Sequence, residues 1–221
     1  MTTILITKTK IFTDHRVTMR GSADEDSTHF DKRPSYRDAK RKVHTHKNLT
    51  LNGVKVVKSF AAGTVREIDI VLGALERSDS VEPVVKLMPN TGATFIFLDE
   101  KGGLHHYRSG FRGGDAVKVI DKPIHVDGSG GNVFDLITPV MKQLRTKVTD
   151  EELFYFCAYL DPVSSVSYDV TDRATGETTL VEYNQAAAAA AVSKVFTLMG
   201  SVKLPKKMSY RRVGTDDDNY N

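Results

Sequence analysis

Apolar and polar residues alternate over short stretches at the start of the chain, and this pattern predicts β-strands. Residues 3–7 (Thr-Ile-Leu-Ile-Thr) are mostly β-branched, and after a polar turn a second such run follows at residues 11–13. We therefore expect a tight hairpin at the amino end. A second hairpin is expected around Asn52-Gly53, because this dipeptide supplies the positive φ angles that a two-residue turn between strands requires.

Further along, the apolar period lengthens to that of a helix. Thr64 is a good helix cap, and it precedes a stripe of apolar residues at positions 65, 68, 72 and 75. Another helix should begin at Thr149, because its hydroxyl and the carboxylate of Glu152 can each accept a bond from a free backbone amide. The other expected helices are 133–144 and 186–200, and the other expected strands are 93–98, 104–107, 117–120, 124–126, 163–170 and 178–183.

The order of these elements indicates the fold class. Strands come first, then helices, then strands again and a last helix, which predicts an α+β protein and not a doubly wound parallel sheet. The 221 residues, 40% of them apolar, suit one domain, which we expect at residues 1–202. Residues 21–46 hold acidic and then basic residues with few large apolar ones, so we interpret them as an exposed charged insertion. Residues 203–221 should form a polar tail.

Composition argues against several classes of protein. The net charge of +3 requires no nucleic acid or membrane, and the basic run at residues 32–42 fits a solvated loop better than a nucleic-acid surface. No run approaches the about 20 apolar residues of a membrane span. The single cysteine, Cys157, excludes a disulfide framework and should pack in the core of a cytoplasmic protein. The seven histidines, including His44, His46, His105 and His106, lack zinc-ligand spacing, so we expect no metal and no cofactor.

Five short motifs, in a fixed order on the expected elements, carry most of the functional information. They are Met1-Thr2-Thr3-Ile4, Asp14-His15-Arg16-Val17-Thr18, Phe60-Ala61-Ala62-Gly63-Thr64, Asp127-Gly128-Ser129-Gly130-Gly131 and Asp161-Pro162-Val163-Ser164-Ser165. None is specific alone. Together they resemble the proteasome β-subunit family, most closely its HslV-type threonine peptidases, from Thr2 to about Tyr183. The resemblance implies an N-terminal-nucleophile hydrolase fold, an α+β four-layer αββα sandwich with antiparallel sheets.

The resemblance also implies a nucleophile, Thr2, exposed once Met1 is removed. A threonine hydroxyl is a poor nucleophile without a base, and an α-amino group with a pKa of about 7.7–8.0 can act as that base at neutral pH. Only a residue at the amino terminus carries both groups. Taken alone, the dipeptide Met1-Thr2 fits the plain start of an edge strand better than a nucleophile, so the downstream motifs carry this assignment.

The other site residues also follow from the resemblance. Asp14 would hold the ammonium of Lys47, with Lys42, Lys55 and Lys58 as rivals for that lysine. Ser129 and Ser164 would bind around the α-amino group, and Asp161 would orient them. Ser59 stands where the family commonly has a glycine, and its backbone amide would form the oxyanion hole. By themselves these residues fit ordinary turns, caps and surface positions.

The function expected from these motifs is that of a threonine-type endopeptidase. The resemblance implies a homo-oligomeric, stacked ring that encloses the sites and receives peptides or unfolded protein from a separate ATPase unfoldase. One alternative is a non-catalytic scaffold or assembly protein that keeps the fold and binds partners through residues 21–46 and its tail. Another is a small-molecule amidase with the same amino-terminal chemistry and no ring.

Overall fold

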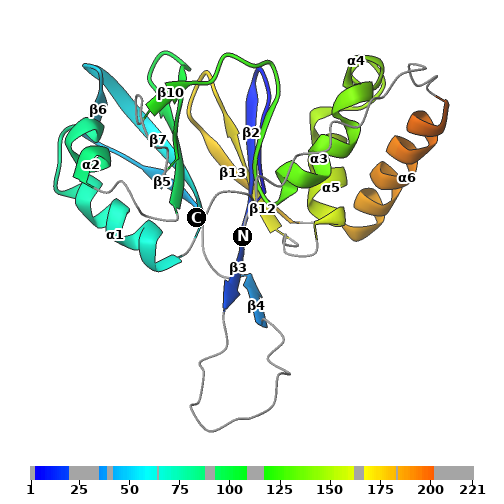
Figure 1. The fold of residues 1–221 in the computed structure, drawn as a ribbon, viewed down its shortest axis with the longest axis horizontal. Helices are drawn as coiled ribbons and strands as arrows, with labels where there is room; N and C mark the ends of the chain where they lie inside the picture. Colours follow the sequence, from blue (N-terminus) through cyan, green and yellow to red (C-terminus); the bar gives the residue numbers. More distant parts are fainter. Residues whose placement is uncertain are drawn as a thin grey trace, which may run out of the picture.

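Two antiparallel sheets lie face to face, with helices on both outer sides (Figure 1). The computed structural model describes residues 3–19, 35–38, 42–63, 65–87, 93–108, 117–161, 167–182 and 184–201. Within these residues the layers follow the order helix, sheet, sheet, helix. The α+β four-layer αββα sandwich expected from the sequence is therefore confirmed.

The first sheet has the strand order β11-β1-β2-β12-β13, and every neighbouring pair is antiparallel. Its strands are β1 (Thr3–Ile6), β2 (Lys10–Asp14), β11 (His125–Gly128), β12 (Ser167–Asp172) and β13 (Thr178–Glu182). The predicted opening hairpin is present, since Ile4 pairs with Thr13 and Ile6 with Ile11. All four residues of β1 are buried, because this strand lies between β11 and β2 with layers on both faces.

The second sheet has the order β10-β9-β8-β7-β5, and β6 also pairs with β7. Its strands are β5 (Val43–Thr45), β6 (Thr50–Leu51), β7 (Val54–Gly63), β8 (Ala93–Asp99), β9 (Leu104–Arg108) and β10 (Val117–Val119). The predicted turn at Asn52-Gly53 is confirmed, with φ of 50° and 75°. β8 pairs with β7 from Val56 to Gly63. A separate pair consists of β3 (Arg16–Met19) and β4 (Ser35–Asp38).

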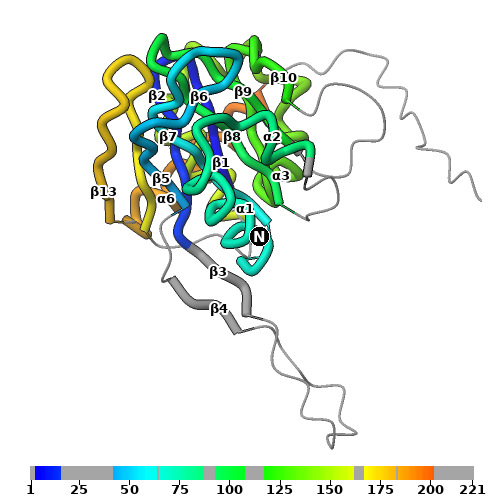
Figure 2. Tube along the Cα trace, turned by 90° about the vertical axis from the view of Figure 1, so that its left-hand side faces the viewer, coloured from blue at the N-terminus to red at the C-terminus, as the bar shows by residue number. Residues whose placement is uncertain are grey.

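Helices cover the outer face of each sheet. α1 (Val65–Glu76) and α2 (Val81–Leu87) belong to the second sheet, and in Figure 2 α1 lies in front of its strands. The first sheet is covered by α3 (Gly130–Ile137), the 3-10 turn η1 (Thr138–Val140), α4 (Met141–Leu144), α5 (Asp150–Leu160) and α6 (Gln185–Ser201). In the described part of the chain, no helix is long and apolar enough to cross a bilayer.

Three helical features compare directly with the sequence predictions. The capping box at Thr149 and Glu152 is confirmed, with both reciprocal bonds present. The single helix expected at 133–144 is wrong: Pro139 has no amide hydrogen and its ring disrupts the preceding turn, so η1 separates α3 from α4. The sequence analysis also missed α2, whose Pro83 lies in the first turn, where proline is tolerated.

The core consists of three apolar clusters, one between each pair of adjacent layers. The cluster between the sheets contains Ile4, Ile6, Ile11, Phe60, Ala62, Ile96, Leu98 and Leu104. A second cluster lies under α1 and α2, and the third under α3, α5 and α6. Cys157 is fully buried in the third cluster, and its burial raises the pKa of the thiol to about 12. The expected packing role of Cys157 is therefore confirmed.

The expected insertion at residues 21–46 extends too far toward the carboxyl end. Residues 43–45 form β5, which pairs with β7 in the second sheet, and Lys42 just before it is buried. The basic run at residues 32–42 concealed this strand, because β5 (Val-His-Thr) has a single apolar residue and gives only a weak apolar pattern. Residues 21–34 and 39–41 of the expected insertion, and residues 202–221 with the expected tail, lie outside the described residues.

Candidate functional site

Thr3 lies at the centre of the candidate site and is bound from two sides. Its backbone N–H donates to Asp14 Oδ1 over 2.9 Å, and its hydroxyl Oγ1 donates to Asp161 Oδ2 over 3.2 Å. Thr3 is the first residue of β1 and is fully buried. The two carboxylates therefore fix the amino-terminal end of β1 between them.

Asp14 forms a buried ion pair with Lys42. Lys42 Nζ lies 3.0 Å from Asp14 Oδ1, and the two side chains are 7% and 0% exposed. Asp14 is the last residue of β2, and Lys42 is held by the sheet, since its carbonyl accepts the amide of Ala61 on β7. A buried carboxylate is costly unless it is paired, so Lys42 and the Thr3 amide together stabilise the charge of Asp14.

The predicted pairing of Asp14 with Lys47 is corrected by this geometry. Lys47 is exposed and lies in a bend between β5 and β6. Lys42, one of the rival lysines, occupies the position next to Asp14. The physical reason is the register of β5 on β7: this pairing places residues 43–45 in the sheet, and the side chain that reaches Asp14 comes from the residue just before them.

Ser129 and Asp161 form the other half of the site. Ser129 Oγ donates to Asp161 Oδ2 over 2.6 Å, and this same oxygen accepts the hydroxyl of Thr3. Ser129 directly precedes α3, and Asp161 is the residue that ends α5, so two helix termini meet at β1. The structure thus brings together three predicted residues, Asp14, Ser129 and Asp161, around Thr3.

Two further predicted residues, Thr2 and Ser164, lie outside the described residues. Thr2 precedes Thr3 in the chain, so one peptide bond joins it to the nitrogen that Asp14 binds. Its expected role as nucleophile and the expected role of Ser164 stay predictions.

Ser59, the expected source of the oxyanion-hole amide, lies in the middle of β7. It is fully buried and pairs with His44 of β5 on one side and Phe97 of β8 on the other. Its Oγ lies 2.8 Å from Nε2 of His46. Burial, with a smaller contribution from His44, lowers the pKa of His46 to about 4, so this ring is neutral at pH 7. The oxyanion role of Ser59 stays a prediction.

Sequence reasoning missed a network directly beside Asp14. His15 Nε2 lies 2.8 Å from Asp169 Oδ2, and His15 Nδ1 lies 3.2 Å from Ser167 Oγ. His15 and Asp169 are both buried. The network fixes the end of β2 against β12, which positions Asp14. The only sequence signal for this network was that His15 directly follows Asp14, since Ser167 and Asp169 lie about 150 residues away in the chain.

Gly130 gives a test of how tightly Thr3 is held. A Cβ added to Gly130 would clash with the side chain of Thr3, whereas one added to the neighbouring Gly131 would meet the carbonyl oxygen of Val126 at 3.4 Å, an ordinary contact. We expect Gly130→Ala to lower the free energy of unfolding by about 1–3 kcal/mol, the usual cost of overpacking, and Gly131→Ala to change it by less than about 1 kcal/mol. Urea unfolding measures both. Equal stability of the two variants would show that Thr3 can move aside.

Two antiparallel sheets with helices on both outer faces form the N-terminal-nucleophile fold of the proteasome type. The solved structures that share it include Anbu, an ancestral beta-subunit, from Yersinia bercovieri. That structure matches with a TM-score of 0.52 and 10% identity over 94% of this chain and 100% of the other.

Two structures of Anbu from Hyphomicrobium sp. strain MC1 are also similar. The Gly-1 mutant has a TM-score of 0.54 and 12% identity, covering 92% of this chain and 98% of that one. The other has a TM-score of 0.50 and 11% identity, covering 94% and 99%. No protein-family model and no curated protein matches the sequence. At these identities the likeness shows the fold.

Proposed function

We propose that the protein is a threonine-type endopeptidase whose nucleophile is Thr2 once that residue is the amino terminus. The observation that carries this proposal is the double attachment of Thr3, through its amide to Asp14 and through its hydroxyl to Asp161. Thr2 directly precedes Thr3, and Thr3 is held beside the Asp14–Lys42 ion pair through its amide and beside the Ser129–Asp161 pair through its hydroxyl.

The chemistry needs a hydroxyl, a base and a charged group that stabilises the base. The hydroxyl oxygen of Thr2 attacks a peptide carbonyl carbon, and its proton passes to the free α-amino group of the same residue. The peptide C–N bond breaks, the leaving amine takes that proton, and an ester to Thr2 is left. Water then attacks the ester with the α-amino group as base, which releases the acid and restores the hydroxyl.

The described side chains suit supporting roles in this reaction. The Lys42 ammonium, held by Asp14, places a positive charge near the amino end of β1, where it favours the neutral amine and the alkoxide-like transition state. Ser129, oriented by Asp161, supplies a hydroxyl that can bind the α-amino group. The Asp14–Lys42 and Ser129–Asp161 pairs therefore act by positioning the α-amino group and by placing charge near it.

Thr3 suits the nucleophile role less well than Thr2. Thr3 is fully buried, its amide is bound to Asp14, and its hydroxyl is bound to Asp161. A substrate carbonyl could reach its Oγ1 only if β1 moved out of the sheet. Thr3 is better explained as the residue that anchors the nucleophile.

Three chains with different amino termini test the proposal. The protein is produced behind a removable amino-terminal extension that ends directly before Thr2, and a second version ends directly before Thr3. We expect hydrolysis of short fluorogenic peptide amides only after the extension is removed from the Thr2 version. Turnover by the uncut fusion, or by the chain that starts at Thr3, would contradict the proposal. A chain with no turnover in any form, but normal folding, would favour the scaffold.

We also propose that the chain works as a homo-oligomeric ring, supplied with unfolded protein by a separate ATPase. One similar structure is named a beta-subunit, which implies an assembly. Several large apolar side chains are exposed on the outer helices of the first sheet, namely Leu136, Tyr159 and Phe196. Such side chains are commonly covered in assemblies. Native mass spectrometry tests the ring, and a monomer at micromolar concentration would contradict it.

A further inference from the structure

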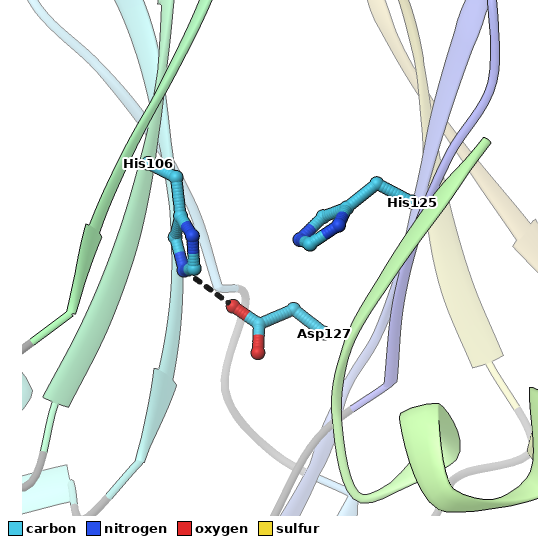
Figure 3. Close-up of side chains that lie close together, drawn as sticks. All are labelled: His106, His125 and Asp127. Atoms are coloured by element: carbon cyan, nitrogen blue, oxygen red, sulfur yellow. Dashed lines mark ion pairs between the residues drawn. The ribbon is translucent and has the colours of Figure 1, made fainter. Parts of the chain in front are cut away.

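A group of three possible metal ligands lies between the two sheets, and none of the three has a role in the candidate active site described above. His106 belongs to β9 of the second sheet, and His125 and Asp127 belong to β11 of the first. His125 and Asp127 are two positions apart on one strand, so their side chains project from the same face. They pair with Ile6 and Ile4, both in the cluster between the sheets, and His106 pairs with Ile96 of that cluster. Figure 3 shows the three side chains directed toward one another.

The distances within this group suit a shared ion. One potential ligand atom from each residue lies within 4.8 Å of the other two. His106 Nε2 is 3.0 Å from Asp127 Oδ2, and the centres of the two imidazole rings are 5.4 Å apart. In a tetrahedral zinc site with bonds of about 2.0–2.1 Å, neighbouring ligand atoms lie about 3.3 Å apart. Small side-chain rotations would therefore bring all three atoms to bonding distance.

The hydrogen bonding of the group is incomplete without another partner. His106 Nε2 and Asp127 Oδ2 are close enough for an ion pair, yet among the described residues neither makes a hydrogen bond of ordinary geometry. His125 Nε2 is likewise buried without a hydrogen-bond partner in that part of the chain. Three buried polar atoms aimed at one point, each without a hydrogen bond, are unusual, because buried polar groups are nearly always satisfied.

We propose that His106, His125 and Asp127 bind one divalent transition-metal ion, with Zn²⁺ the best match. Two imidazole nitrogens and one carboxylate oxygen form a ligand set that suits Zn²⁺ and is too rich in nitrogen for Mg²⁺ or Ca²⁺. Three protein ligands leave one position of a tetrahedral site for water. The ion would join an edge strand of the first sheet to β9 of the second.

The surroundings of the group favour metal binding. Asp127 Oδ1 accepts the amide of Gly128 over 2.7 Å, which orients the carboxylate as second-sphere bonds do in metal sites.

Metal binding would also restrain part of the candidate active site. β11 runs from His125 to Gly128 and leads directly into Ser129, whose hydroxyl binds Asp161. In the same strand Asp127 pairs with Ile4, and Gly128 pairs with Thr3. An ion held by Asp127 would therefore restrain the segment that carries Ser129. The metal site itself does not depend on peptidase activity.

Calorimetry of the full, untagged chain tests the site. The protein is freed of metal with a chelator, dialysed and titrated with ZnCl₂. We expect one ion per chain with micromolar or tighter affinity, and a loss of at least about 100-fold in His125→Asn and in Asp127→Asn, by analogy with other metal sites, where even second-sphere changes cost 10–100-fold. The control is His105→Asn. His105 is also on β9, where its Nε2 lies 2.9 Å from Asp99 Oδ2. Among the described residues it belongs to no group of three possible ligands, so this variant should bind Zn²⁺ as the wild type does.

Visible absorption of the Co²⁺-loaded wild-type chain gives a second readout that does not depend on any variant folding. A tetrahedral site with nitrogen ligands should give intense bands, whereas weak bands typical of hexahydrated Co²⁺ would overturn the proposal. Zn²⁺ binding that is unchanged in His125→Asn, or equally weakened in His105→Asn, would also overturn it.

Discussion

Replacing Thr2 by alanine is expected to abolish peptide hydrolysis by the chain that begins at Thr2. The substitution removes the attacking oxygen and keeps the α-amino group, so no acyl intermediate can form. Loss of a nucleophile in a hydrolase commonly costs several orders of magnitude, and we expect kcat to fall at least about 1,000-fold. Steady-state hydrolysis of fluorogenic peptides measures this effect.

Thr2→Ser is the matched control for this substitution. It keeps the hydroxyl and the amine and loses only a methyl group, so it should retain measurable turnover. The melting temperature of both variants should stay near that of the wild type, because the bonds from Thr3 to Asp14 and Asp161 are kept. Undiminished turnover in Thr2→Ala would mean that another residue attacks the substrate.

Replacing Lys42 by alanine is expected to lower the free energy of unfolding strongly, because it removes one charge of a buried ion pair. Lys42 and Asp14 are 7% and 0% exposed at a distance of 3.0 Å. Removing one partner of a buried ion pair leaves the other charge without its compensation and typically costs about 3–5 kcal/mol. Urea unfolding of Lys42→Ala should show a loss of this size, and peptide hydrolysis should fall strongly even where the variant is folded.

Two further variants distinguish the loss of the Asp14–Lys42 ion pair from a general effect of removing a positive charge. Lys47→Ala removes an exposed lysine only five residues away, so its free energy of unfolding should change by less than about 0.5 kcal/mol. The double variant Asp14→Asn/Lys42→Met removes both charges and should regain part of the stability but none of the activity. If Lys42→Ala were as stable as Lys47→Ala, the ion pair would not be part of the folded protein.

Local sequence signals predicted much of the fold. The Asn52-Gly53 turn and the capping box at Thr149 depend on residues close together in the chain, and both were found. The errors arose where a local signal was overlooked or weak. Pro139 interrupts an apolar period that otherwise predicts one helix, and β5 was hidden by the charged residues before it.

The candidate site was less accessible from the sequence. Asp14, Ser129 and Asp161 could be named from the resemblance, and they meet around Thr3. The choice between Lys42 and Lys47 depends on how β5 pairs with β7, and spacing along the chain does not fix that register. β5 precedes the Asn52-Gly53 turn and β7 follows it, so this turn signal does not align the two strands.

The possible metal ligands show the same limit more strongly. His125-Val126-Asp127 is visible as two ligands on one strand face, but His106 belongs to another sheet. Only the packing of β9 against β11 brings it within reach. The expectation of no metal rested on zinc-ligand spacing within the sequence, and that criterion cannot detect ligands joined by sheet packing.

The central claim, that Thr2 acts as an amino-terminal nucleophile, is tested most directly by intact-protein mass spectrometry. The expressed chain is measured before and after incubation with an epoxyketone or β-lactone probe that reacts with amino-terminal threonine. We expect loss of the methionine mass followed by one probe adduct that maps to Thr2. A chain that begins at Thr2, is folded, and takes up no probe would contradict the claim.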